Sequence, residues 1–316
     1  MALQQVAILG LGLIGASLGL SLKRDPSPPR VVGFDIRSES LRSAARSGAI
    51  DRSCGTLPEV CNGSDVVVLA APVQAILELI PEIGPHLDQG TLVTDMGGTK
   101  SEIVRVAETA LPPGVGFVGG HPLTGRLTVG VGQASASLYP GARYCLTPSG
   151  NTPAWAVERA IELVERVGSQ PLFLDPDEHD ALLAAASHLP YFASAALFSA
   201  VAEQKSWPDV SGLAAGGFRS TTSLVDADPA MWADVAGSNR ENIVRQLDGL
   251  IGRLQRIREA IQADDGSLIQ ELRSAQERHQ AWISGQPTAA IAPPESQGNF
   301  EGRRGSGWMD RFRGAK

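Results

Sequence analysis

The stretch VAILGLGLIGASLG, residues 6–19, has the pattern of a short apolar strand, a glycine turn and the beginning of a helix. Gly10, Gly12 and Gly15 fit G-x-G-x-x-G. Gly10 allows the tight turn after the strand, Gly12 lets a pyrophosphate approach the backbone, and Gly15 lets the helix pack closely on the strand. The free N–H groups and the positive dipole end of that helix would face the phosphates. This stretch therefore predicts a dinucleotide-binding unit.

The second strand of the predicted unit, residues 31–34, is followed by Asp35, which lies 20 residues after Gly15. A carboxylate at this position binds the ribose 2′-hydroxyl of NAD and repels the 2′-phosphate of NADP, so we expect NAD. Arg37 is the feature that favours NADP, because it could hold a 2′-phosphate; alternatively it is a solvated loop charge. The alternative for residues 6–19 as a whole is a glycine-rich turn between a strand and a helix that binds no ligand. The residues predicted to bind the cofactor are Gly10, Gly12, Leu13, Ile14, Gly15, Asp35, Arg37, Ala71 and Pro72.

The composition limits the class of protein. With 316 residues, the chain is long enough for two domains with substantial cores. Its 27 Lys and Arg against 34 Asp and Glu give a net charge of −7, which argues against a nucleic-acid binder and a membrane-surface protein. Cys54, Cys61 and Cys145 have no metal-like spacing, so we predict no metal site. We expect no signal peptide, no membrane span and a reduced, cytoplasmic setting.

Strands alternate with helical stretches from residue 3 to about residue 175. Further strands are predicted at residues 64–72, 91–95, 116–119, 143–147 and 171–174, with helices at residues 38–47, 73–83, 100–111 and 155–167. This alternation predicts an α/β, Rossmann-type doubly wound sheet with right-handed crossovers. Ligands of such sheets bind at the carboxyl ends of the strands. We therefore expect the site near Gly10, Asp35, Ala71, Asp95 and His121.

No further strand is predicted after Asp177, so an all-α C-terminal part should follow. Residues 178–204 predict a long apolar helix that tolerates Pro190. Residues 243–261 and 268–282 carry apolar residues in steps of three and four, and a capping box at Ser238 precedes the first series. These seams predict a homodimer interface; alternatively, they pack within one subunit. The predicted domains are an NAD-binding domain (1–175), a helical substrate-binding and dimerisation domain (176–285) and a disordered tail (286–316).

Histidines are candidates for general acid–base chemistry, because an imidazole titrates near neutrality. His121 lies at a predicted strand exit in GGHPLTG, where the glycines and the proline make a tight loop that could expose the ring. His188 lies in SHLPY, where Pro190 would kink the helix and present the ring. The alternative for each is a histidine satisfied by a hydrogen bond, with no chemistry. For His179, next to Asp180, we expect a capping or packing role.

Together, these motifs resemble the prephenate/arogenate dehydrogenases of tyrosine biosynthesis. The resemblance covers about residues 4–282. It rests on GLGLIGASLG, VVLAAPV, TDMGGTKSEI, FVGGHPLTG, LYPGARYCLTP, the pair HD at His179, SHLP at Ser187 and GGFRSTTSLVDADPAMWADVAGSNRENI. The order and spacing of so many pieces are much more specific than the glycine pattern alone.

The resemblance implies NAD-dependent oxidative decarboxylation of prephenate to 4-hydroxyphenylpyruvate. In the family, a hydride leaves the hydroxyl-bearing carbon, and a histidine that His121 matches takes up the hydroxyl proton. Loss of the ring carboxylate as CO₂ then makes the ring aromatic. His188 matches the substrate-site histidine of the helical domain, Trp232 matches an aromatic residue near the site, and Lys100 ends a motif that lies near the floor of the cleft.

Three positions depart from the family's pattern. Gly98 replaces a serine that works beside the catalytic histidine, and Thr99 could supply a hydroxyl from the neighbouring position. Arg126 stands where the family has a small or hydroxyl residue, and the glutamate that follows it there is missing. Ser223 replaces a substrate-binding arginine, for which Arg126 is the preferred stand-in and Arg219 the second. The predicted catalytic residues are His121, Thr99 and Lys100, and the predicted substrate-binding residues are His188, Arg126, Arg219 and Trp232.

Three alternative functions remain open at this point. Arogenate could be the substrate, although the missing acid disfavours a substrate with a positive amine. A related β-hydroxyacid dehydrogenase would need a catalytic lysine in the helical domain, where Lys205 is the only lysine in residues 175–285 and nothing marks it as catalytic. A non-catalytic NAD-binding sensor is the third, because Gly98 and Ser223 replace family residues.

Overall fold

The computed structural model describes residues 3–124 and 131–285. The predictions about Arg126 and about the tail, residues 286–316, lie outside the described residues. The chain divides into two compact units, Met1–Ile251 and Gly252–Lys316, which are described separately below. The predicted domain boundary after residue 175 stays a prediction.

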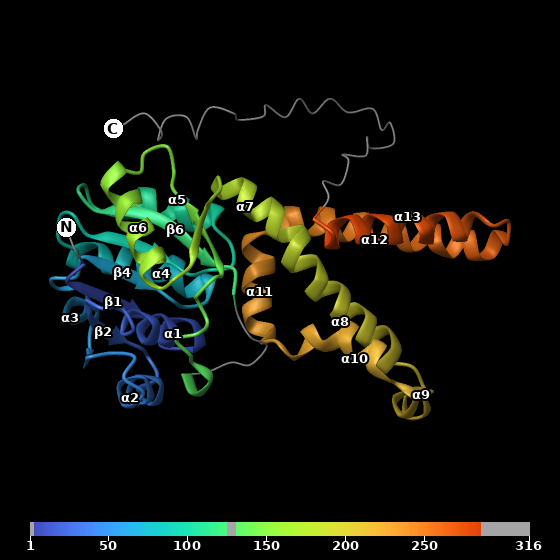
Figure 1. Ribbon diagram of the computed structural model, residues 1–316, viewed down its shortest axis with the longest axis horizontal. Helices are drawn as coiled ribbons and strands as arrows, with labels where there is room; N and C mark the ends of the chain where they lie inside the picture. The colour runs from blue at the N-terminus through green and yellow to red at the C-terminus, as the bar shows by residue number, and fades with distance from the viewer. Residues whose placement is uncertain (1–2, 125–130, 286–316) are drawn as a thin grey trace. The chain divides into compact units, whose positions relative to one another are not determined.

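The first unit contains an eight-stranded sheet in the order β3-β2-β1-β4-β5-β6-β7-β8 (Figure 1). The strands are β1 (Gln5–Leu9), β2 (Arg30–Phe34), β3 (Arg52–Ser53), β4 (Val66–Leu69), β5 (Leu92–Asp95), β6 (Gly116–Pro122), β7 (Arg143–Thr147) and β8 (Gln170–Phe173). All neighbours pair in parallel except β6 and β7, which are antiparallel. The strand order reverses between β1 and β4, the place where doubly wound sheets bind ligands. The predicted Rossmann-type fold is confirmed.

Helices connect the strands as the sequence pattern predicts. They are α1 (Leu13–Leu22), α2 (Ser38–Arg46), α3 (Leu57–Cys61), α4 (Val73–Ile83), α5 (Ser101–Ala110) and α6 (Ala154–Arg166), with short 3₁₀ turns η1 (Gly84–His86) and η2 (Val131–Gln133). The bounds of α4 and β7 coincide with the predicted ranges. β3 and α3 were not predicted, because two and five residues are too short to show a period.

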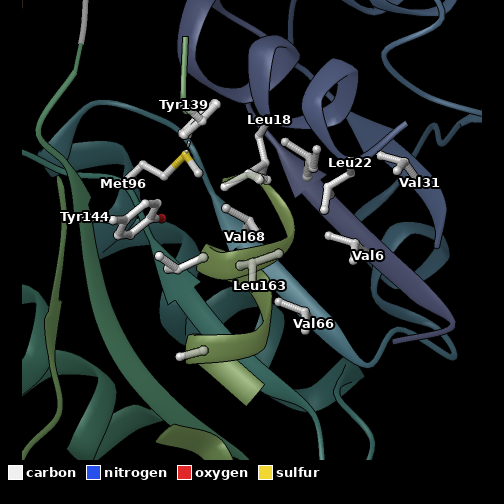
Figure 2. Close-up of a cluster of buried hydrophobic side chains, with 14 of the residues drawn as sticks. Val6, Leu18, Leu22, Val31, Val66, Val68, Met96, Tyr139, Tyr144 and Leu163 are labelled. Atoms are coloured by element: carbon white, nitrogen blue, oxygen red, sulfur yellow. Dashed lines mark hydrogen bonds between the residues drawn. The ribbon is translucent and has the colours of Figure 1, made fainter. Parts of the chain in front are cut away.

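The core lies on both faces of the sheet. Figure 2 shows one face, where Val6, Val66 and Val68 of the strands contact Leu18 of α1 and Leu163 of α6. The intervening strand residues point to the opposite face, where a second cluster contains Ala7, Leu9, Val67, Leu69, Ile76, Ile80 and Val93. Burial of such a side chain stabilises the fold by about 1.5–3 kcal/mol. Strands buried on both faces therefore hold their carboxyl ends in a fixed arrangement.

A continuous helical stretch, Pro176–Ala202, follows the sheet. It consists of α7 (Pro176–Leu183), a π-helical turn η3 (Ala184–His188) and α8 (Leu189–Ala202). Pro190 has no N–H to donate, and its ring conflicts with regular α-helical geometry, so the wider π turn directly before it relieves the conflict. The predicted long helix with a distortion at Pro190 is thus confirmed. By length and composition alone, the stretch would also be able to cross a membrane, which for one isolated helix is weak evidence.

The remaining helices of the first unit follow α8. They are α9 (Trp207–Leu213), α10 (Gly216–Thr222), the 3₁₀ turn η4 (Ser223–Asp226), α11 (Pro229–Ser238) and the first half of α12 (Arg240–Ala263). Of these, α11 packs against α4 beside the sheet. The capping box predicted at Ser238 is wrong. Ser238 is the last residue of α11, and its hydroxyl donates to the carbonyls of Asp234 and Val235 instead of capping α12.

The second unit holds the rest of α12 and α13 (Ser267–Ile283). Glu271 contacts Arg253 at 3.5 Å and Arg256 at 3.7 Å, so ion pairs join the two helices. Ile261 and Trp282 of the predicted seams are 59% and 69% exposed. The apolar residues of α12 and α13 in this unit are therefore not all packed within one subunit, as the alternative would require.

Candidate active site

The glycine turn after β1 is shaped by close backbone contacts. Gly10 has φ +97°, and a Cβ there would lie 2.3 Å from the carbonyl oxygen of Ala70. A Cβ on Gly15 would lie 2.0 Å from the carbonyl oxygen of Gly10. A Cβ on Gly12, in contrast, would meet no atom within 4 Å. Gly10 and Gly15 are thus needed by the fold itself, whereas the open space at Gly12 is available to a ligand.

Asp35 is held at the mouth of this turn. Its Oδ2 accepts a hydrogen bond from the N–H of Leu11 at 2.7 Å, and its Oδ1 accepts one from the N–H of Arg37 at 2.8 Å. The Arg37 side chain lies 3.6 Å from Asp35 and is 66% exposed. Helix α1 begins at Leu13 without a side-chain cap, so its first N–H groups are free to face an anion. The residues present fit a dinucleotide whose pyrophosphate lies at α1 and whose ribose lies at Asp35.

A buried ion pair anchors the ends of β5 and β6. The ammonium of Lys100 contacts Oδ2 of Asp95 and donates to the carbonyl of Gly120 at 2.8 Å. The N–H of Gly97 donates to the same Asp95 oxygen at 2.8 Å. Lys100 is 0% exposed. Its ammonium thus joins the end of β5 to the end of β6, and the catalytic role predicted for it stays a prediction.

His121 is linked to a second histidine that comes from the helical part of the unit. Its Nδ1 lies 2.9 Å from Nε2 of His179, and Nδ1 of His179 lies 2.8 Å from Oδ1 of Asp180. Asp180 also accepts hydrogen bonds from the N–H groups of Lys100 and Ser101, at 2.7 and 2.9 Å. His121 comes from β6, His179 and Asp180 from α7, and the two N–H groups from the beginning of α5. The cluster thus joins the consecutive elements α5 and β6 to α7, with His179 58 residues after His121.

Burial keeps the histidines of this cluster neutral. It lowers the pKa of His121 well below 6.5, and the neighbouring His179, Lys100 and His188 lower it further. Burial also lowers the pKa of His179, against the opposing effect of Asp180. Burial raises the pKa of Asp180, but its hydrogen bonds with His179, Ser101 and Lys100 outweigh this and leave the pKa lowered. At pH 7 the neutral ring of His179 thus lies between the neutral ring of His121 and the ionised carboxylate of Asp180.

His188 lies against the beginning of α12. Its Nδ1 is 3.2 Å from Nδ2 of Asn239, which also donates to the backbone carbonyl of Asp180 at 2.8 Å. The backbone of Gly98 bonds the ring as well, and burial lowers the pKa of His188 to about 4. Trp232 packs edge-to-face on His188 at 5.9 Å and stacks on Tyr191 at 4.1 Å. The buried indole N–H of Trp232 has no hydrogen-bond partner among residues 3–124 and 131–285.

The residues near the three sequence departures lie in different surroundings. The hydroxyl of Thr99 lies 2.8 Å from that of Ser238, so α11 engages it. A Cβ on Gly98 would lie 3.6 Å from Val235, which leaves room for a side chain there. The Ser223 hydroxyl donates to the carbonyl of Ser220, and Arg219 is exposed on α10. Within the described ranges, neither Thr99 nor Arg219 contacts His121 through a hydrogen bond or ion pair.

Sequence reasoning missed several members of the cluster. His179 was expected to cap or pack, yet it bonds His121 directly. Asp95 was expected only as a strand exit, and Asn239 was not considered. The available signal was the family motif that contains His179 and Asp180, but no local pattern shows which residue such a pair contacts.

Comparisons with known proteins agree with this architecture. Residues 18–172 match the family model "Prephenate dehydrogenase, nucleotide-binding domain", and residues 175–274 match "Prephenate dehydrogenase, dimerization domain". Prephenate dehydrogenase of Bacillus subtilis is 32% identical over 262 residues, 82% of this chain and 71% of its own length. That of Lactococcus lactis is 32% identical over 306 residues, 94% of this chain and 84% of its own.

A solved structure is similar over most of both chains. It is prephenate dehydrogenase from A. aeolicus in complex with hydroxyphenyl propionate and NAD⁺. The TM-score is 0.83 at 28% identity, and the alignment covers 89% of this chain and 99% of the other. The arrangement of a Rossmann-type sheet followed by helices is thus shared with an enzyme of known ligands.

Proposed function

This chain belongs to the prephenate dehydrogenase family, and we propose that it oxidises prephenate with NAD⁺ to 4-hydroxyphenylpyruvate, CO₂ and NADH. The observation that carries the proposal is the position of His121 at the carboxyl end of β6, beside β5 in the sheet, where burial lowers the pKa of its imidazole well below 6.5. A neutral imidazole is the form that takes up a proton.

Residues of the glycine turn and its surroundings hold the cofactor. Gly12 leaves space for the pyrophosphate, the N–H groups of Leu13 and Ile14 at the beginning of α1 face it, and Asp35 binds the ribose hydroxyls. Ala71 and Pro72 follow β4 on the other side of the switch point, where they border the cofactor. When bound, NAD⁺ supplies the acceptor for the hydride.

His121 performs the proton transfer. Its free ring nitrogen takes the proton of the ring hydroxyl as that carbon loses a hydride and becomes a carbonyl. The ring then loses its carboxylate as CO₂, and the electron pair of the broken C–C bond completes the aromatic ring. The oxygen regains a proton to form the phenol, so the proton held by His121 can return to it. The overall reaction therefore releases no net proton.

Side chains from the helical part bind the rest of the substrate. Trp232 offers a buried indole N–H without a protein partner, and His188 lies beside it. Arg126 or Arg219 supplies the cation for the side-chain carboxylate, in place of the family's arginine that Ser223 replaces. Thr99 acts through Ser238 rather than directly on His121, because its hydroxyl is engaged there. Lys100 positions the strand exits through Asp95.

We assign the exposed apolar seams to a homodimer. Ile261 and Trp282 lie among apolar residues of α12 and α13 that the single chain leaves exposed. The model that matches residues 175–274 describes a dimerization domain. We assign the enzyme to the cytoplasm, where its three free cysteines stay reduced.

The direct test is NADH formation by the purified protein, with prephenate and arogenate offered separately and with NAD and NADP in parallel. Turnover of prephenate with NAD is expected. Turnover of arogenate alone would retain the chemistry and change the substrate. If NAD binds but neither compound is turned over, the protein is a sensor or acts on another hydroxy acid, and the proposal is wrong.

A further inference from the structure

His179 is a fully buried histidine that the proton transfer at His121 does not use directly. It lies between two polar groups, with its Nε2 2.9 Å from Nδ1 of His121 and its Nδ1 2.8 Å from Oδ1 of Asp180. Both His179 and Asp180 come from α7, whereas His121 comes from β6. Burying a polar group costs free energy unless it is hydrogen-bonded, and both ring nitrogens of His179 have a partner.

The donor in the contact with Asp180 follows from its charge. Asp180 accepts the N–H groups of Lys100 and Ser101 at 2.7 and 2.9 Å, and such hydrogen bonds favour the ionised form. An ionised carboxylate can only accept. The proton between Asp180 and His179 therefore belongs to Nδ1 of His179.

The second contact then has only one possible direction. A neutral imidazole carries one N–H and one lone pair, so the lone pair of His179 lies on Nε2. Burial favours this neutral form of His179. The proton between the two rings therefore belongs to Nδ1 of His121, and the lone pair of His121 lies on Nε2. Among the described residues, no hydrogen bond engages that second nitrogen.

We propose that His179 and Asp180 are positioning residues, which hold the His121 ring and place its lone pair on Nε2, where it serves as the base. This inference deepens the proposed function and rests on it, because His121 acts as a base only if the protein oxidises a hydroxyl group. When Nε2 takes up the hydroxyl proton, His121 becomes a cation whose Nδ1–H still points at Nε2 of His179. The negative charge of Asp180 stabilises that cation through the intervening ring.

The arrangement also makes the base dependent on the packing of α7 against α5 and β6. A shift of α7 by about 1 Å would lengthen the contact between the rings beyond hydrogen-bond range. His121 could then adopt either tautomer, and the fraction with the lone pair on Nε2 would fall. A merely structural role for His179 predicts no such link.

The first experiment reads the tautomers without requiring turnover. In the full-length protein with ¹⁵N-labelled histidine, NMR distinguishes a protonated ring nitrogen from an unprotonated one. We expect His121 to be protonated on Nδ1 and unprotonated on Nε2, with the same pattern in His179. Protonation of His121 on Nε2 would overturn the inference, even if the protein proved inactive on prephenate.

The second experiment measures kinetics on two substitutions of His179. His179→Leu removes the acceptor, and kcat should fall about 100-fold or more with KM and the Kd of NAD nearly unchanged. His179→Gln keeps an acceptor for Nδ1 of His121 and should recover at least a tenth of the wild-type kcat. An equal loss of kcat in His179→Leu and His179→Gln, or a wild-type kcat in His179→Leu, would contradict a positioning role.

Asp175→Ala is the matched control for damage to α7. The Asp175 side chain caps the same helix by accepting the N–H groups of Asp177 and Glu178, and it does not contact the cluster. The backbone carbonyl of Asp175 accepts the N–H of His179 at 2.8 Å, and the substitution keeps this bond. This substitution should weaken the beginning of α7 while keeping kcat within about threefold of wild type. If Asp175→Ala loses as much activity as His179→Leu, the effect of His179 is structural and the inference fails.

Discussion

The cofactor half and the catalytic half of this site are built in different ways. Most of the cofactor half comes from residues 5–35, and its shape is decided by backbone contacts such as that of Gly10 with Ala70 at the end of β4. The catalytic half is built by side chains that come from β5, β6, α7 and the junction between α11 and α12, with His121 and His179 separated by 58 residues. The first is therefore visible as a local pattern, whereas the second exists only after α7 has packed on the sheet.

The largest effect expected in the catalytic half is that of His121→Asn. Removal of the general base should lower kcat about 10³-fold, which corresponds to about 4 kcal/mol of transition-state stabilisation. Because the glycine turn is separate, the Kd of NAD should change less than twofold. Stopped-flow measurement of NADH formation and fluorescence titration with NAD check the two values. Loss of NAD binding would show that the two halves are not independent.

The largest effect in the cofactor half concerns the fold itself. Gly10→Ala places a Cβ 2.3 Å from the Ala70 carbonyl at φ +97°, and should cost about 3 kcal/mol in the free energy of unfolding. Gly48→Ala is the matched control, since Gly48 has φ +75° and open space around its Cβ position. It should cost only about 1 kcal/mol. Urea unfolding measures both.

Gly12→Ala should separate binding from stability in the same turn. Its added methyl meets open space in the free protein, so its free energy of unfolding should stay within about 0.5 kcal/mol of wild type. The same methyl occupies the space assigned to the pyrophosphate, so the Kd of NAD should rise about tenfold or more. Unchanged NAD affinity would contradict the placement of the phosphates.

Acidification should destabilise the catalytic half in particular. The folded-state pKa of His188 is lowered from 6.5 to about 4, so the unfolded chain binds more protons between these values. Stability is thus fully present above pH 6.5 and is lost as the pH falls towards 4, with about 2 kcal/mol lost between pH 7 and pH 5. Buried His121 and His179 add to the loss in the same direction.

Urea unfolding at pH 7 and pH 5 tests this prediction. His188→Gln should reduce the pH dependence, because it removes one titrating group. Exposed His86→Gln is the control and should leave the dependence unchanged. An equal free energy of unfolding at both pH values would contradict the burial of neutral histidines.

The smallest expected effect concerns the choice of cofactor. Asp35→Asn removes the charge that repels a 2′-phosphate but keeps an acceptor for the N–H of Leu11. The ratio of kcat/KM for NAD over NADP should fall about tenfold, or about 1.4 kcal/mol. If Arg37 holds the phosphate, adding Arg37→Gln should remove the gain with NADP. An unchanged ratio would mean that Asp35 does not bind the ribose.

The success of the sequence predictions follows the same division. Apolar strands such as β4 and helices such as α4 are found from the sequence because burial imposes a period on neighbouring residues. The predicted capping box at Ser238 failed because its hydroxyl bonds α11 and Thr99, and a local motif does not show such partners. His188 and Trp232 were each assigned to the substrate site through the resemblance; their rings lie 5.9 Å apart, and their roles stay predictions.

The sequence alone determined the strand–turn–helix unit, the acidic residue at its mouth and the helical character of the second half. Glycine spacing, apolar periods and an acid directly after a strand show these features within residues 6–35 and along single helices. The direction of the hydrogen bonds around His121 was decided only by the tertiary structure. Lys100, His179 and Asp180 acquire their partners when α5, α7 and β6 pack together and exclude water. A buried charge must then find a fixed donor, and this requirement sets the tautomer of each ring.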